Sequence, residues 1–209
     1  MRIDLLKTSP DRAGRYWVTF SDGSRLGLYR QTVQDFGLYT GMELEEDQLE
    51  SLRTAAGNMS AKMRAVRIVS ASSVSRQDLE DRLIRKGEDP EQAKAAVEWM
   101  EELHLVDDRN TAEAVVHSCI AKGYGLSRAK QALFEKRIPK EYWEAALADY
   151  PDQADRIESF LRARLDADSD QKDIKRAVDA LLRRGHSYGT VRKVLNGLSF
   201  DTEDYFEDE

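Results

Sequence analysis

Aromatic and β-branched residues gather in two short runs near the start of the chain, with polar residues between them. The runs are Arg15–Phe20 and Arg25–Tyr29, and the segment that joins them contains Asp22 and Gly23. Two such runs around an Asp-Gly turn are typical of a β-hairpin. Because two strands alone are marginally stable in water, a third strand, for which residues 3–6 are the candidate, or a covering helix is also required.

The segment that follows has the spacing of a helix. Between Glu45 and Ala56, Leu49 and Leu52 fall on one helical face, and Gly57 stands where a C-cap is expected. We therefore predict that residues 1–57 form a small α+β module that closes with this helix.

From residue 58 onward the β pattern is replaced by helical spacing with short breaks. Helix starts are marked by a capping residue or a proline, at Ser75, Pro90 and Pro139. Helix ends are marked by glycine, at Gly87, Gly123 and Gly185. The predicted helices are 59–72, 76–86, 90–104, 109–121, 126–136, 139–148, 152–166, 170–184 and 188–197.

These helices fall into a repeat. When Gly87, Arg137 and Gly185 are aligned, at spacings of 50 and 48 residues, four surrounding positions are apolar in every copy. They are Leu79, Leu83, Ala93, Val97, Ala129, Leu133, Trp143, Leu147, Ala177, Leu181, Val191 and Leu195. The prediction is a mainly α protein: an elongated tandem array of three-helix repeats at 58–107, 108–150 and 151–198, stacked because each repeat buries little surface alone.

The formal charge is distributed unevenly along the chain. The 209 residues carry 32 basic and 39 acidic side chains, a formal charge of -7 that argues against a nucleic-acid partner. The predicted parts carry -2, -2, +1 and +2, and residues 199–209 carry -6. The acidity is therefore concentrated in a short tail, which we expect to be flexible. The C-terminal half that precedes the tail is mildly basic.

Cysteine and hydropathy exclude further classes of protein. One cysteine excludes a disulfide scaffold and a Cys-based zinc site. No apolar run approaches the roughly 20 residues of a spanning helix, and the first residues lack the apolar segment of a secretory signal. We expect a soluble cytoplasmic protein that has no contact with a membrane.

Candidate chemistry is sparse. Asp107 and Asp108 are adjacent carboxylates, for which capping of the helix near Arg109 is the first interpretation and a metal-dependent nuclease the alternative. The histidines, His104, His117 and His186, share no metal-ligand spacing. We therefore expect no cofactor, no metal and no enzymatic activity.

Two further features have structural interpretations. Cys119 lies among apolar residues and is interpreted as a small core residue. Residues 122–125, Lys-Gly-Tyr-Gly, lack the strand and the Lys-Ser/Thr pair of a phosphate-binding loop. They are interpreted as a glycine-terminated helix that turns into the next one, with Tyr124 packed across the turn.

Basic side chains in the second and third repeats are the remaining candidates for a binding site. They are Arg128, Lys130, Lys136, Arg137, Lys172, Lys175, Arg176, Arg183, Arg184, Arg192 and Lys193, with Lys140 nearby. Lys172, Lys175 and Arg176 stand at i, i+3 and i+4 and so share one helical face. This face is either ordinary solvated surface or a positive stripe that meets phosphate or an acidic protein groove.

Four segments of the chain follow one another in a familiar order: residues 75–87, Leu103–Ala112, Lys122–Leu126 and Leu133–Ile138. On these segments the chain resembles the RecX family of recombinase regulators. The resemblance covers about 65 contiguous residues and extends more weakly to residue 198. The N-terminal module is similar to the extension of Firmicute-type members. One departure is Lys136-Arg137-Ile138, where the family commonly has Lys-Gly-Ile.

The resemblance implies a protein that binds the groove of the RecA nucleoprotein filament. Such proteins modulate RecA, usually by inhibition of its recombinase, ATPase and coprotease activities in DNA repair, homologous recombination and the SOS response. The basic side chains named above would then face RecA or DNA, and we expect the protein to act as a monomer. The alternative is direct binding of single- or double-stranded DNA by helix-turn-helix-like three-helix units.

Overall fold

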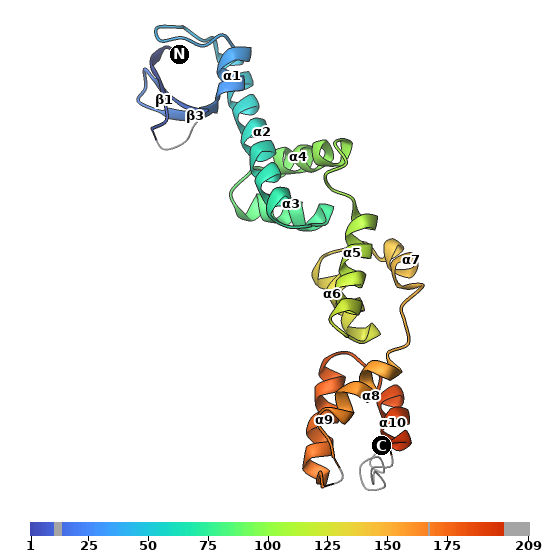
Figure 1. The fold of residues 1–209 in the computed structure, drawn as a ribbon. Coiled ribbons are helices and arrows are strands. Elements are labelled where there is room, and N and C mark those ends of the chain that lie inside the picture. The colour runs from blue at the N-terminus through green and yellow to red at the C-terminus, as the bar shows by residue number, and fades with distance from the viewer. Residues whose placement is uncertain (11–13, 167, 199–209) are drawn as a thin grey trace. The chain divides into compact units, whose positions relative to one another are not determined.

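The computed structural model describes residues 1–10, 14–166 and 168–198, and Figure 1 shows their helices and strands. The predicted acidic tail lies outside these residues. The chain forms two compact units, one spanning Met1–Asp107 and one that begins at Asp108. The mainly helical fold class, with a small β module at the N-terminus, is confirmed.

The first unit opens with a three-stranded antiparallel sheet. Its strands are β1 (Ile3–Thr8), β2 (Arg15–Phe20) and β3 (Arg25–Tyr29), in that order. Gly23 adopts φ +81° in the turn between β2 and β3, where a side chain would be strained. The predicted hairpin and the third strand are both present, and β1 runs two residues beyond the segment we expected.

A short helix, α1 (Arg30–Asp35), directly follows β3 and was not predicted. Together with the start of α2 (Glu46–Ala71), it covers the apolar face of the sheet. The largest fully buried side chains of this core are Ile3, Leu28 and Leu52. The covering helix that the hairpin requires is therefore supplied from the same unit.

The helix end predicted at Gly57 is wrong, because α2 continues through this residue to Ala71. Gly57 has no positive φ, so it is an ordinary helical residue and not a C-cap. The missing side chain leaves space that the end of the Gln92 side chain fills from the facing helix. As a result, one helix contributes to two cores, with Leu52 in the first and Ala61 in the second.

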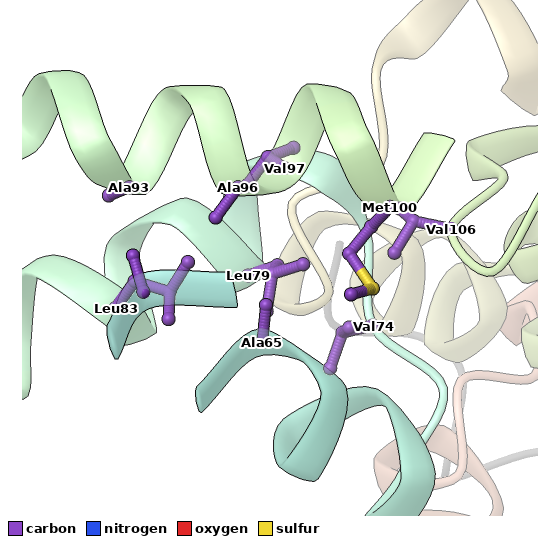
Figure 2. Close-up of a cluster of buried hydrophobic side chains, with 10 residues drawn as sticks. Ala65, Val74, Leu79, Leu83, Ala93, Ala96, Val97, Met100 and Val106 are labelled. Carbon is purple, nitrogen blue, oxygen red and sulfur yellow. The ribbon is translucent and has the colours of Figure 1, made fainter. Parts of the chain in front are cut away.

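The second core of this unit lies between α2, α3 (Arg76–Arg85) and α4 (Pro90–Glu102). Figure 2 shows Ala93 and Ala96 of α4 turned toward Leu79 and Leu83 of α3, and Val97 belongs to the same buried cluster. Both helix starts are capped as their sequence indicates. The Ser75 hydroxyl accepts a hydrogen bond from Asp78 N–H at 3.1 Å, and the Asp89 carboxylate accepts one from Glu91 N–H at 2.9 Å.

The second unit contains two further sets of helices. The first set is α5 (Asp108–Ala121), α6 (Leu126–Glu135), the 3-10 turn η1 (Lys140–Tyr142) and α7 (Trp143–Leu147). The second set is α8 (Ala154–Arg162), α9 (Gln171–Arg183) and α10 (Tyr188–Gly197). Each set surrounds its own buried cluster of apolar side chains.

Two predicted helices of this unit are shorter than expected. The predicted helix 139–148 is divided into η1 and α7, and the Trp143 indole N–H bonds back to Ile138 O at 3.0 Å. The predicted helix 152–166 is reduced to α8, because the Asp152 carboxylate accepts a hydrogen bond from Ala154 N–H and fixes a later start. The remaining predicted helices agree within two residues at each end, apart from 59–72, which the structure joins to the preceding helix in α2.

The repeat alignment has a structural counterpart at its reference position. Gly87, Arg137 and Gly185 all adopt positive φ, at +87°, +55° and +84°. Arg137 holds this conformation without being glycine, at a cost of about 1 kcal/mol. Ten of the twelve aligned apolar side chains are buried, and Trp143 and Leu147 are half-buried. The division of the chain into five parts stays a prediction.

We predict that Gly57→Ala stabilises the protein. Alanine is favoured over glycine inside a helix by about 1 kcal/mol, and the Gln92 side chain is flexible enough to move away. Thermal or urea unfolding should therefore give a free energy of unfolding higher by about 0.5–1 kcal/mol. A loss of stability would contradict either the continuous α2, since a left-handed C-cap resists alanine, or the displacement of the Gln92 side chain.

Candidate interaction surface

Within the second unit, the turn between α5 and α6 contacts the turn between α9 and α10 backbone to backbone. Gly125 N–H donates to Arg184 O at 2.9 Å, and Ser127 N–H donates to Gly185 O at 3.2 Å. A Cβ on Gly125 would collide with Gly185 O, and one on Gly185 would collide with the backbone N of Arg128. Both glycines are therefore required by close approach, and two turns that lie far apart in the chain are held together.

Side chains reinforce this contact. His186 is buried, and its Nε2–H donates to Gly123 O at 3.1 Å. Burial is the main reason why the pKa of His186 lies below its ordinary value; the hydrogen bond to Gly123 opposes this shift, and the Arg184 charge adds to it. The imidazole is therefore neutral at pH 7 and carries its proton on Nε2. The structure thus assigns His186 a packing role between two turns.

The same turn receives two more hydrogen bonds. The Tyr150 hydroxyl donates to Tyr124 O at 2.7 Å, and the Arg156 guanidinium donates to Ile120 O. Gly123 adopts φ +67° between α5 and α6, so the interpretation of residues 122–125 as a glycine-terminated helix turn is confirmed. Tyr124 is half-buried.

The contact between the turns brings predicted basic residues from different helices into one neighbourhood. Arg128 lies in the first turn of α6 beside Gly185, with its guanidinium 3.0 Å from Glu135 Oε1. Arg183 ends α9 and Arg184 caps it, so both occupy a helix C-terminus, where positive charge is favourable. Because sequence spacing cannot show that Arg128 and Arg184 approach one another, this grouping was not predicted.

Arg156 and Arg164, which the predicted set does not contain, belong to the same region. The Arg164 guanidinium lies 3.8 Å from the centre of the Phe160 ring, and the Arg184 guanidinium lies 4.9 Å from it. Such cation–π contacts are worth about 0.5–1 kcal/mol at exposed sites. The i, i+4 spacing of Phe160 and Arg164 is a signal from which this pair could have been found. No spacing in the sequence indicated the contact that Arg156 makes.

The basic residues of α9 are exposed on the face opposite its buried apolar side chains. Lys172, Lys175 and Arg176 are all exposed, whereas Ile174 and Val178 are buried. Arg176 pairs with Asp173 at 3.2 Å across solvent-exposed surface. An ion pair of this kind contributes about 0–1 kcal/mol, so Arg176 can exchange its partner at little cost.

The other predicted basic residues are distributed over α6 and α10. Lys130 and Arg137 are exposed and Lys136 is half-buried, while Arg192 and Lys193 are exposed on α10. Lys193 lines a cleft of about 410 Å³ between α8 and α10 together with Asp152 and Glu158. Because these carboxylates offset its charge, Lys193 is a weaker candidate for an anion contact than the arginines at the end of α9.

The other chemically reactive candidates are two carboxylates and a thiol. Asp108 is the buried first residue of α5, and Asp107 precedes it on the surface. Over the described ranges, no three His, Cys, Asp or Glu side chains gather as they would around a metal ion. Cys119 is buried in the helical core, as predicted, and burial raises the pKa of its thiol. None of the described helices is long and apolar enough to cross a bilayer.

The fold and this surface define a class of protein: a helical-repeat protein with exposed basic side chains on α6, α9 and α10. The sequence profile described as "RecX, second three-helix domain" matches residues 107–147. The chain belongs to the RecX family, whose members carry the name regulatory protein.

Named relatives agree with this family, and a solved structure agrees with the fold. Regulatory protein RecX of Chlorobaculum tepidum is 30% identical over 140 residues, which cover 65% of this chain and 86% of the relative. Regulatory protein RecX of Vibrio parahaemolyticus is 29% identical over 157 residues, covering 71% of this chain and 96% of the relative. A crystal structure of regulatory protein RecX matches with a TM-score of 0.63 at 21% identity, covering 93% of this chain and 98% of that one.

We predict that Gly125→Ala destabilises the second unit by more than about 2 kcal/mol, because the new methyl group must displace the Gly185 backbone. Gly189→Ala is the matched control, since no atom lies within 4 Å of its Cβ and the change should stay within about 1 kcal/mol. Urea unfolding of both variants measures the difference. Equal stabilities would contradict the contact between the two turns.

Proposed function

We propose that this protein binds the groove of the RecA nucleoprotein filament and inhibits its recombinase, ATPase and coprotease activities. The observation that carries the proposal is the exposed basic surface on α6, α9 and α10, in a chain whose relatives are named regulatory protein RecX. Inhibition would arise from occupation of the groove by a charged helical surface. It would require no covalent step and no cofactor.

The physical basis of binding would be the exchange of weak surface ion pairs for contacts with the filament. Arg128 and Arg176 each pair with a carboxylate on exposed surface, at 3.0 and 3.2 Å. Such pairs are weak in water, so phosphate or carboxylate groups of a partner can compete for the same guanidinium groups. Because the contact between the turns fixes Arg128 relative to Arg184, the cations would meet the filament as one pattern.

Direct DNA binding is the second candidate. The observation that favours it is the exposed face of α9, where Lys172, Lys175 and Arg176 follow one another along a single helix. On this alternative, inhibition of RecA would be competition for free DNA and would vanish when DNA is in excess. On the filament proposal, inhibition persists at saturating DNA.

We predict that reversing the charge of Arg176, Arg183 and Arg184 together weakens inhibition at least tenfold, because three exposed cations would become anions facing a negatively charged filament. The measurement is RecA-dependent ATP hydrolysis on single-stranded DNA, titrated with the full chain at saturating DNA.

The matched control is the triple charge reversal of Arg25, Arg30 and Arg53, which are exposed in the first unit. Circular dichroism and thermal unfolding establish that both variants are folded. Unchanged inhibition by the folded Arg176, Arg183 and Arg184 variant would overturn the assignment of this surface. Inhibition that disappears with excess DNA for the unmodified chain would favour the DNA-binding alternative.

A further inference from the structure

A basic cleft lies in the first unit, between the C-terminal part of α2 and α3. Its volume is about 420 Å³, and its lining is rich in cations and contains a small apolar floor. The lining residues are Arg64, Arg67, Ile68, Ala71, Ser72, Arg82 and Lys86. The segment that contains them has a net negative charge in the sequence, which is why the cleft was not predicted.

Two of the arginines are held in place by carboxylates. Arg64 Nε lies 2.6 Å from Glu88 Oε1, and Arg64 Nη1 donates to Lys86 O at 3.0 Å. Glu88 is itself buried, so this ion pair is a structural element of the cleft wall. Arg82 binds both carboxylate oxygens of Asp78, at 2.9 and 2.8 Å. The side chains of Arg64 and Arg82 remain about a third exposed, at 33% and 32%, so their guanidinium groups are fixed yet accessible.

Four cations line the cleft, and two carboxylates contact them, so the cleft keeps an excess of positive charge. Arg67 and Lys86 are exposed and supply this excess. Within the described part of the chain, no carboxylate lies within ion-pair distance of Lys86 Nζ. An anionic group entering the cleft would therefore meet cations whose charge the protein leaves uncompensated.

The cationic surface continues from the cleft onto the sheet. Arg67 Nη2 donates to the Tyr29 hydroxyl at 3.3 Å, and Arg15 Nη2 donates to the same oxygen at 2.6 Å. The Arg15 guanidinium also lies 4.3 Å from the centre of the Tyr29 ring. Arg15 on β2 and Arg67 on α2 thus both contact Tyr29, and Arg67 also lines the cleft, so the cations extend from the cleft to the sheet.

We propose that this cleft, with Arg67 and Lys86 as its exposed cations, binds the phosphodiester backbone of a nucleic acid. A nucleic-acid strand presents one negative charge at each nucleotide, so a row of cations can contact successive phosphates. The apolar floor of Ile68 and Ala71 and the ring of Tyr29 suit the sugars and bases between them. The proposal requires no RecA and concerns the first unit, so it is independent of the proposed function.

The test uses the double variant Arg67→Gln/Lys86→Gln in the full chain. These substitutions spare Arg64 and Arg82, because removal of Arg64 would leave Glu88 buried without a counter-charge. The matched control is Arg25→Gln/Arg53→Gln, which removes the same charge from exposed positions of the same unit. Arg53 precedes Arg64 by 11 residues, about 16 Å along α2.

The probe is a short fluorescein-labelled oligo(dT), and the measurement is fluorescence anisotropy between about 50 and 200 mM salt. We expect the double variant to bind about tenfold more weakly at the lowest salt. We also expect its log affinity to depend less steeply on log salt, by about 0.7 for each lost phosphate contact. The control variant should bind as the unmodified chain does.

Two results would overturn the proposal. The first is oligonucleotide binding by Arg67→Gln/Lys86→Gln that equals the control in affinity and salt dependence. The second is a loss, in this variant, of binding to a fluorescent poly-glutamate peptide while oligonucleotide binding is unchanged, which would assign the cleft to an acidic protein segment. Loss of RecA inhibition alone leaves the proposal standing, because oligonucleotide binding is measured without RecA.

Discussion

The second unit depends on one contact, in which two glycine-containing turns pack backbone against backbone. Gly125 N–H reaches Arg184 O, and neither Gly125 nor Gly185 has room for a side chain. Without this approach, α6 and α9 would belong to separate three-helix sets that share few groups. With it, Arg128 and Arg184 occupy fixed positions relative to each other.

In the first unit, a continuous helix and not a contact between turns holds the two cores together. There a single helix, α2, enters the core beneath the sheet through Leu52 and the core of the first helical set through Ala61. Because α2 is continuous across Gly57, Arg64 and Arg67 are held on the same rigid element that supports the sheet. The cleft cations and Tyr29 on β3 therefore keep their relative positions because α2 is one continuous helix. In the second unit, the basic residues keep theirs because two backbone turns pack closely.

Local patterns predicted the elements well and their mutual contacts poorly. The β-hairpin, most helix boundaries and the positive φ at Gly87 and Gly185 follow from local turn and periodicity rules. Gly57 was misread because a glycine after an apolar helical face has the same local signature whether the helix ends or continues. The contact of Gly125 with Arg184 joins residues far apart in the chain, which periodicity does not encode. Arg64 and Arg67 have helical i, i+3 spacing, but charge averaged over an acidic segment concealed them.

His186 holds the two helical sets of the second unit together, at the contact between the two glycine-containing turns. The most direct test is an NMR titration of the His186 side chain in the folded chain and in the chain unfolded in urea. We expect the pKa of His186 in the folded chain to lie below the ordinary value of 6.5, because the side chain is buried. Because the folded pKa is the lower one, the stability of the second unit should be complete above the unfolded pKa and decrease as the pH falls below it. A His186 that titrates alike in the folded and the unfolded chain would contradict this packing of His186 between the two turns.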